Sequence, residues 1–270
     1  MGARDDAKEI LMPQQFRPRI TMALGILCLL LMNPAFVENK RPGYVTTGTA
    51  IAIVARSDQI AAAADSKILL GPDRISSWDC KIKQCENAFF AIAGHRRVEL
   101  TDFDAIYIAT EACKTTNNIA DRMSKFETLI EAALSNMLRA SQQRDRVYFE
   151  ISLRDKTVLQ AAFFGFERGS PYLNVRSYKC HMSSGQVVVE VERQGCQSQC
   201  DMLTILGESR AIEQYVSQTP SYKKRPPIEL VKEFVELEIA DKPGVVGPPI
   251  DVLQITKTGV VWKERKQDCQ

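Results

Sequence analysis

The chain has 270 residues, of which 45% are hydrophobic and 25% are charged, an ordinary composition for a globular protein. This length allows one large domain or two small ones. Lys and Arg number 35 against 33 Asp and Glu, so the net charge is only +2, which argues against nucleic acid or an anionic surface as a partner.

An apolar run near the N-terminus, residues 20–32, follows the basic residues Arg17 and Arg19. The run is too short to span a bilayer comfortably. A basic segment, a short apolar run and a small residue, here Ala35, form the pattern of a secretory signal. We therefore expect residues 1–35 to be a signal peptide and the protein to be exported, either periplasmic or secreted. An uncleaved signal anchor, which would be the only membrane contact, and a buried helix of the domain are the alternatives.

Seven cysteines lie outside this apolar run. In an oxidising compartment they predict up to three disulfides and one free thiol. Cys196 and Cys200 are close enough to pair locally, and Cys113, in a predicted helix, is expected to be the free one. The alternative is a metal site built from Cys180, His181, Cys196 and Cys200. We disfavour it because Cys180 and His181 are adjacent, whereas zinc ligands usually have spacers between them. We expect no metal and no other cofactor.

A segment rich in turn residues, 36–48, is expected to form a loop that leads, as a propeptide or linker, into a domain at 49–270. Two apolar runs, 49–55 and 59–64, then flank a short polar break. Neither run alternates polar with apolar residues. They therefore predict a hairpin that is buried on both faces.

Polar residues stand at both ends of this hairpin, Thr49 and Asp65, and Lys81 follows beside a third apolar run. A hydroxyl is a weak nucleophile without a base, but a threonine at a new chain start carries its own base, because an α-amine titrates near pH 7.7–8. A lysine held charged by an aspartate would stabilise the developing alkoxide. Such chemistry requires cleavage between Gly48 and Thr49.

The hairpin, with AAADSK at its end, resembles the start of proteasome β-subunits, which are N-terminal-nucleophile (Ntn) hydrolases. In that family a glycine precedes the nucleophilic threonine, an aspartate lies sixteen residues on and a lysine thirty-two on. Gly48, Thr49, Asp65 and Lys81 occupy those positions. The stretch NAFFAIAGH resembles the strand that ends in the oxyanion-hole glycine, which would be Gly94, one position short of the commonest spacing. Beyond this residue the resemblance is only architectural.

The rest of the chain predicts an α+β protein. Apolar spacing indicates helices at 98–114, 119–142, 209–217 and 228–240, and strands at 147–153, 161–167, 172–179, 186–192, 202–206 and 249–256, with a hairpin return at 258–259. Two facing sheets, each covered by a helix pair, would satisfy this order. A single-domain, four-layer αββα sandwich is also the fold that the resemblance implies.

Two supporting positions of the family are matched less closely. In the family, a serine directly follows the glycine after a late strand. Here Glu208 occupies that position, so the candidate is Ser209, one residue further along the chain. Alternatively, Ser209 only caps its helix. The family's second aspartate would be Asp241, with Asp251 as a weaker candidate.

Two functions are compatible with these residues. The first is an exported, proteasome-like hydrolase that cleaves an amide bond in a peptide or another small amide. Thr49 would be its nucleophile, Asp65 and Lys81 its electrostatic pair, and the N–H of Gly94 its oxyanion donor. The second is a catalytically silent relative that serves as an exported binding or scaffold protein, which Glu208 favours. A homo-oligomer is compatible with either, and no nucleic-acid partner is expected.

Overall fold

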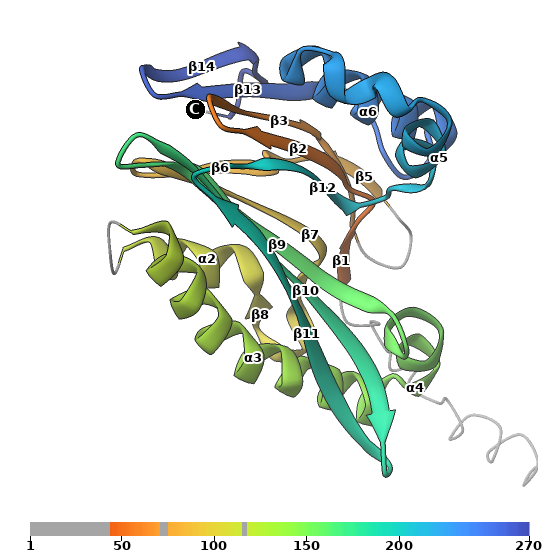
Figure 1. Cartoon of the computed structure of the whole chain (residues 1–270). Helices are drawn as coiled ribbons and strands as arrows, with labels where there is room; N and C mark the ends of the chain where they lie inside the picture. The colour runs from red at the N-terminus through yellow and green to blue at the C-terminus, as the bar shows by residue number, and fades with distance from the viewer. Residues whose placement is uncertain (1–43, 71–74, 115–117, 270) are drawn as a thin grey trace, which may run out of the picture. The chain divides into compact units, whose positions relative to one another are not determined.

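A computed structural model describes residues 44–70, 75–114 and 118–269 of the chain (Figure 1). The predicted signal, 1–35, and most of the predicted propeptide lie outside the described residues. Within them, the chain is mixed α and β, with five α-helices and fourteen strands that pair antiparallel throughout. The α+β class predicted from the sequence is confirmed at this level.

The strands form two sheets. The larger one has nine strands in the order β11-β10-β9-β7-β1-β4-β5, with β6 and β8 also paired to β7. Its members are β1 (Tyr44–Thr47), β4 (Lys67–Leu70), β5 (Ile75–Trp78), β6 (Ile82–Cys85), β7 (Ala88–Val98), β8 (Phe103–Asp104), β9 (Thr157–Glu167), β10 (Ser170–Ser183) and β11 (Gln186–Gln197). The smaller one has the order β12-β2-β3-β13-β14. Its members are β2 (Ala50–Arg56), β3 (Gln59–Asp65), β12 (Asp201–Gly207), β13 (Ile250–Thr256) and β14 (Gly259–Glu264).

The helices fall into two groups along the chain. The first group is α2 (Ala105–Cys113), α3 (Ile119–Arg144) and the short α4 (Arg146–Tyr148), which continues into a π-helical turn, Phe149–Leu153. The second is α5 (Arg210–Gln218) and α6 (Pro227–Asp241), joined by a short 3-10 helix, Pro220–Lys224. In Figure 1, α2 and α3 lie along one face of the larger sheet, and α5 and α6 lie beside the smaller one.

The β2–β3 hairpin is buried on both faces, as predicted. Ile51 and Ile53 pack into a cluster shared with the larger sheet, while Ala52 and Val54 pack against α5 and α6. A third cluster joins α2 and α3 to the other face of the larger sheet. The small side chains of β3, four consecutive alanines from Ala61, leave room for close packing on both sides.

Two element predictions are wrong. The segment 147–153, predicted to be a strand, is helical, with Phe149 and Leu153 buried while Val147 and Ile151 are exposed. Residues four apart share one face of a helix, so the alternating apolar pattern resembled a strand by coincidence. The first half of the predicted helix 98–114 is instead the end of β7, a 3-10 turn and β8, and α2 begins only after Asp104, whose carboxylate accepts the Tyr107 N–H as an N-cap.

The predicted loop 36–48 also needs correction at its C-terminal end. Residues Tyr44–Thr47 form β1, which pairs with β7 on one side and with β4 on the other. Thr47 lies opposite Gly94, and Thr46 lies opposite His95. The segment directly before Thr49 is therefore a strand within the larger sheet.

Three disulfides join cysteines among the described residues: Cys80–Cys269, Cys85–Cys113 and Cys196–Cys200. The local Cys196–Cys200 pair is confirmed. The prediction of a free Cys113 is wrong, because α2 packs on β7 and its last residue, Cys113, forms a disulfide with Cys85 at the end of β6. Among the described residues, the buried Cys180 is the free thiol. Three disulfides indicate an oxidising, exported environment. None of the helices in the described part of the chain is both long and apolar enough to cross a membrane.

Candidate active site

Thr49 lies at the junction between the two sheets, because it follows β1 of the larger sheet and precedes β2 of the smaller one. Two glycines allow this crossing. A Cβ on Gly48 would overlap Val245, and a Cβ on Gly207 would overlap the carbonyl oxygen of Thr49. Gly207 has a φ of +85°, a conformation that favours glycine. The next residue, Glu208, donates its N–H to the Thr49 carbonyl at 2.6 Å.

Lys81 reaches the peptide bond before Thr49. Its Nζ donates to the carbonyl oxygen of Gly48 at 2.9 Å and to Oδ1 of Asp65 at 2.6 Å. The side chains of Lys81 and Asp65 are both 0% exposed. The structure thus brings the predicted Asp65, Lys81 and the Gly48–Thr49 junction into one buried cluster.

Asp65 is fixed by backbone groups from three parts of the chain. Its Oδ1 accepts the Ala50 N–H at 2.9 Å, and its Oδ2 accepts the N–H groups of Lys67 at 3.1 Å and Gly247 at 3.2 Å. Gly247 belongs to the segment between α6 and β13, which sequence reasoning did not connect to the site. These bonds hold the carboxylate in one orientation, and the carboxylate in turn orients Lys81.

Burial shifts both members of this ion pair toward their neutral forms. Desolvation raises the pKa of Asp65, against the opposing effect of Lys81 and of the backbone N–H groups. Desolvation also lowers the pKa of Lys81 to about 8; Asp65 opposes this shift, and the charge of Arg96 adds to it. Lys81 therefore changes its charge near neutral pH, where a group that takes part in proton transfer or charge stabilisation is most effective.

The hydroxyl of Thr49 is buried, and its Oγ1 has no hydrogen-bond partner among the described residues. An unpaired buried hydroxyl costs free energy, and such groups concentrate at functional sites. In a threonine, Oγ1 and the preceding carbonyl carbon are separated by three atoms, so attack of one on the other closes a five-membered ring. The arrangement thus places a free hydroxyl next to a carbonyl that Lys81 polarises.

Gly94 lies in β7, opposite Thr47 of β1 on one side and Leu159 of β9 on the other. Its φ is +96°, and a Cβ at this position would be 2.5 Å from the carbonyl oxygen of Val158. Only glycine fits there. The predicted glycine therefore stands beside the strand that leads into Thr49, and its role as an oxyanion donor remains a prediction.

The two supporting residues are engaged elsewhere. The Ser209 hydroxyl donates to Glu213 at 2.6 Å and makes no cap bond, although Ser209 directly precedes α5. Asp241 forms an exposed ion pair with Arg210 at 2.5 Å. Among the described residues, the side chains of Ser209 and Asp241 therefore have partners other than Thr49.

Three other polar residues that the sequence singled out also have partners. Glu208, at the position where the resemblance implies a serine, pairs with Lys242. The weaker candidate Asp251 is buried in β13, where it accepts the Lys266 N–H at 2.7 Å, so it anchors the C-terminal segment. His95 is buried, with Nδ1 3.0 Å from the Tyr148 hydroxyl, and burial lowers its pKa to about 4.

The alternative metal site does not form. Cys196 and Cys200 are joined in a disulfide, and Cys180 lies far along β10 from the Leu173 that faces Cys196. Within the described residues, no group of three or more metal-ligating side chains gathers elsewhere.

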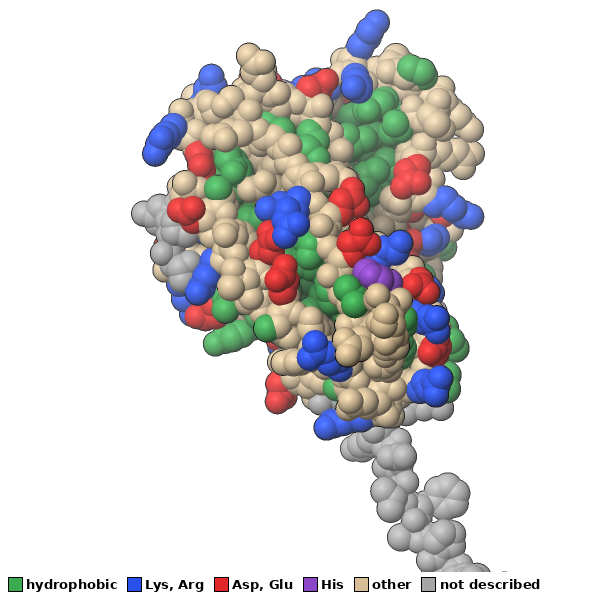
Figure 2. Space-filling view, turned by 60° about the horizontal axis from the view of Figure 1, so that its bottom comes forward, with side chains coloured by type: hydrophobic (Ala, Val, Ile, Leu, Met, Phe, Trp, Pro, Cys, Tyr) green, Lys and Arg blue, Asp and Glu red, His purple; other side chains and the backbone are tan. Residues whose placement is uncertain are grey.

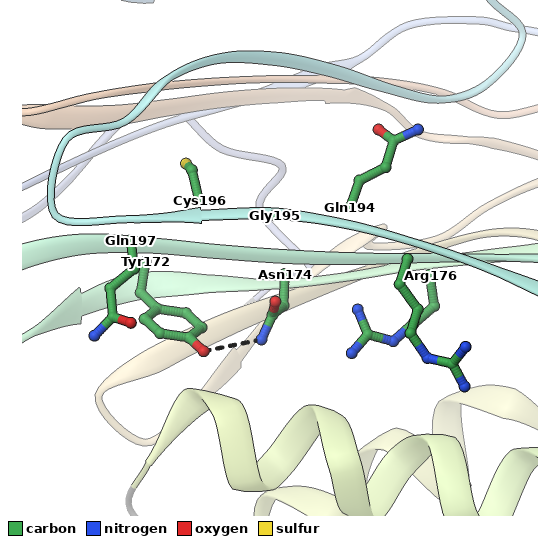
Figure 3. A pocket seen from close by; sticks show the side chains of 8 residues that line it. Tyr172, Asn174, Arg176, Gln194, Gly195, Cys196 and Gln197 are labelled. Atoms are coloured by element: carbon green, nitrogen blue, oxygen red, sulfur yellow. Dashed lines mark hydrogen bonds between the residues drawn. The ribbon is translucent and has the colours of Figure 1, made fainter.

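A hollow of about 330 Å³ lies on the β10–β11 hairpin. Tyr172, Asn174 and Arg176 point toward the helix that covers this sheet, and Tyr172 and Asn174 are hydrogen-bonded at 3.2 Å (Figure 3). Its two guanidinium groups, on Arg176 and Arg193, are already held by Glu127. Cys200, the disulfide partner of Cys196 in the lining, directly precedes Asp201. Asp201 pairs with the end of β2 that is farther from Thr49, so it lies about 20 Å from Thr49 along the strand. We assign this hollow no part in the site.

The surface shows no field of one sign on the face seen in Figure 2, where basic and acidic side chains are interspersed. No protein-family model matches this chain, and no curated protein matches it at a significant level. The resemblance to proteasome β-subunits therefore depends on the residues of the site themselves.

Proposed function

We propose that the protein is an exported, proteasome-like Ntn hydrolase that first cleaves its own chain between Gly48 and Thr49 and then hydrolyses an amide bond in a peptide or a small amide. The observation that carries the proposal is the contact of the Lys81 ammonium with the Gly48 carbonyl oxygen, inside a buried cluster next to the free Thr49 hydroxyl. A structural salt bridge alone would not require a carbonyl acceptor at that bond.

Self-cleavage follows from this geometry. Thr49 Oγ1 attacks the Gly48 carbonyl carbon, and Lys81 stabilises the oxyanion that forms on the carbonyl oxygen. The C–N bond then breaks, the hydroxyl proton passes to the leaving nitrogen, and the Gly48 acyl group becomes an ester on Oγ1. Water hydrolyses this ester. The products are a Gly48 carboxylate and a free Thr49 with an α-amine, which then serves as the base for the hydroxyl.

The position of β1 favours an extended peptide as substrate. This strand pairs with both β7 and β4, so its departure after cleavage would leave two strand edges unpaired. A peptide strand can bind such edges through its backbone. Gly94, as oxyanion donor, lies on one of them.

The arrangement of the hydrophobic clusters also supports the proposal. One lies between α2 or α3 and the larger sheet, one between the sheets, and one between the smaller sheet and α5 or α6. We infer from this order the four-layer αββα sandwich that Ntn hydrolases share, in one domain at 49–270. We further infer that residues 1–35 are the export signal.

Intact mass and N-terminal sequencing of three forms test the proposal. The wild-type chain should begin at Thr49, and Thr49→Ala should retain the Gly48–Thr49 junction and lack amidase activity. Ser66→Ala is the matched control, because Ser66 is also a buried hydroxyl without a partner among the described residues and is adjacent to Asp65. It should be cleaved like the wild type.

The second candidate function is a silent, exported binding or scaffold protein of the same fold. The observation that favours it is the engagement of Ser209 by Glu213 and of Asp241 by Arg210, away from Thr49. If this function holds, wild type and Thr49→Ala would have the same N-terminus, upstream of Thr49, and neither would hydrolyse amides.

A further inference from the structure

The segment that carries Lys81 has no regular structure of its own. It connects β5 with β6, and residues 79–81 belong to neither strand. Lys81 is nevertheless 1% exposed, and its Nζ contacts both Asp65 and the Gly48 carbonyl oxygen. A lysine side chain is flexible, and holding it in one arrangement costs conformational entropy. Contacts from other parts of the chain must therefore fix the backbone that bears it.

A C-terminal strap, residues 265–269, provides one such contact. The strap follows β14 of the smaller sheet, and its Cys269 forms the disulfide with Cys80. Cys80 directly precedes Lys81, so the disulfide fastens the backbone of the lysine to a residue 189 positions away in the sequence. Cys269 is buried and Cys80 is half-buried, so the bond lies below the surface.

Asp251 anchors the strap to the smaller sheet. This residue is 0% exposed and lies in β13, opposite Ala64 of β3. Its Oδ1 accepts the Lys266 N–H at 2.7 Å, and its Oδ2 lies 3.7 Å from the strap sulfur of the disulfide. Because Ala64 directly precedes Asp65, the strap is anchored beside the strand that bears the carboxylate partner of Lys81.

Lys81 is thus connected to the smaller sheet in two ways. Its side chain reaches Asp65 at the end of β3, and its backbone reaches β13 and β14 through the disulfide and the strap. The strands on both sides of Lys81, β5 and β6, belong to the larger sheet. The disulfide therefore fixes the distance between the two parts of the fold that the buried ion pair also joins.

We propose that Cys80, Cys269 and Asp251 are positioning residues, which hold the Lys81 ammonium against the Gly48 carbonyl oxygen for self-cleavage. They act through Lys81 and not on the reacting bond. This inference rests on the proposed function, because the reaction that they assist is cleavage of the junction that Lys81 contacts. Without the disulfide, the connection between β5 and β6 would lose its covalent tie to the smaller sheet, and the ammonium would spend less time at the carbonyl.

Two double variants of the full chain test the proposal. Cys80→Ala/Cys269→Ala removes the disulfide of the strap. Cys85→Ala/Cys113→Ala is the matched control, because it removes a disulfide from the other end of the same strand, β6. Mass spectrometry of purified precursor should show self-cleavage slower by about tenfold or more in the strap variant, and within about twofold of the wild-type rate in the control. Equal rates in the two double variants would overturn the proposal.

The pH profile of self-cleavage separates positioning from a general loss of stability. The charged groups that act on Lys81 are Asp65 of β3, Arg96 of β7 and Asp79 of the connection. Burial lowers the pKa of Lys81 to about 8, so wild-type cleavage should slow above that pH. A lysine that water reaches more freely titrates closer to its ordinary pKa of 10.5, so the slowing should move to higher pH in the strap variant alone. A slower rate with an unchanged pH profile would show a structural role only, and would contradict the proposal.

Asp251 allows a test that leaves the disulfide in place and so does not depend on the folding of the cysteine variants. Asp251→Ala removes the acceptor of the Lys266 N–H, whereas Asp251→Asn keeps an oxygen that can accept it. Asp251→Ala should slow self-cleavage about threefold or more, and Asp251→Asn should restore most of the wild-type rate. Equal rates in the two variants would remove Asp251 from the positioning role.

A labelling experiment measures the position of Lys81 without cleavage. In the Thr49→Ala background, the wild-type disulfides, the strap variant and the control can all be compared with the junction intact. A short pulse of an acetyl N-hydroxysuccinimide ester acetylates accessible lysines, and peptide mass spectrometry quantifies each site. Lys81 should be acetylated about tenfold faster in the strap variant than in the other two forms. The exposed Lys125 of α3 should be acetylated at one rate in all three.

The two readouts distinguish failure of this inference from failure of the proposed function. If the wild-type chain is not cleaved before Thr49, the proposed function fails, and the labelling still decides whether the strap positions Lys81. Acetylation of Lys81 at the same rate in the strap variant and the control would overturn the positioning role, whatever the result for cleavage.

Discussion

The Nζ atom of Lys81 lies 2.9 Å from the carbonyl oxygen of Gly48, the residue that precedes Thr49, whose buried hydroxyl has no hydrogen-bond partner among the described residues. The same ammonium lies 2.6 Å from Asp65. A positive charge at this carbonyl stabilises an oxyanion, so the proposed mechanism gives Lys81 the role of a donor to the carbonyl rather than of a base toward the hydroxyl.

This role predicts the pH dependence of self-cleavage. Burial lowers the pKa of Lys81 to about 8, so the ammonium loses its proton as the pH rises through that value, and cleavage should slow there. Lys81→Met should slow cleavage about 100-fold or more, as the loss of an oxyanion donor does elsewhere. Mass spectrometry of purified precursor, incubated on both sides of pH 8, measures both effects. A rate that rises through pH 8 would identify Lys81 as a base instead.

Gly207→Ala should disturb the candidate site, although Gly207 lies far from Thr49 in the sequence. A Cβ there would overlap the Thr49 carbonyl oxygen, and the φ of +85° adds strain. Gly185→Ala is the control, because Gly185 has a similar φ of +80° and a Cβ added to it would meet no atom within 4 Å. We expect a loss of about 1 kcal/mol in the free energy of unfolding for Gly185→Ala and about 2 kcal/mol more for Gly207→Ala. Urea unfolding measures the difference, and equal losses would show that the close approach to Thr49 has no consequence.

The three disulfides should contribute to the free energy of unfolding in the order of the lengths of the loops they close, with the longest loop contributing most. Their sequence separations are 189 for Cys80–Cys269, 28 for Cys85–Cys113 and 4 for Cys196–Cys200. The chain-entropy relation gives about 5, about 4 and about 2 kcal/mol for replacement of each pair by alanine. Urea unfolding of the three double variants tests this order. A larger loss for Cys196–Cys200 than for Cys80–Cys269 would show that native-state contacts outweigh loop closure.

His95 should make the fold sensitive to acid. Burial lowers its pKa to about 4, whereas an unfolded histidine titrates near 6.5. As the pH falls from about 6.5 to about 4, the unfolded state takes up a proton that the folded state does not, so the free energy of unfolding falls by about 3 kcal/mol. His95→Gln should flatten this part of the stability curve, as measured by urea unfolding at a series of pH values. An unchanged slope would assign the acid sensitivity to other groups.

The hairpin was predictable from the sequence because it depends on a local feature. The apolar runs around residues 56–58 carry no alternation, and β2 and β3 are indeed buried on both faces. The resemblance to proteasome β-subunits implied a common location for Thr49, Asp65 and Lys81, and the Lys81 contacts with Asp65 and Gly48 are consistent with it.

Other features were missed for two reasons, an overlooked local signal and tertiary contacts that a single sequence does not reveal. The local signal is Asp145, which accepts the N–H of Tyr148 and so starts a helix where an alternating apolar pattern predicted a strand. The partner of Cys113 depends on how α2 packs on β7, which brings Cys113 to Cys85. Nothing in the spacing indicated that Arg96 would be buried with two nitrogens unpaired among the described residues. An N-cap search would have identified Asp104 and Asp145.

The N-terminus of the mature protein, isolated from its native compartment, tests the central claim most directly. The account predicts a chain that begins at Thr49, whose free α-amine can then serve as the base. A mature chain in which the Gly48–Thr49 bond is intact would contradict it, because Thr49 would have no amine and the Lys81 contact with the Gly48 carbonyl would be structural only.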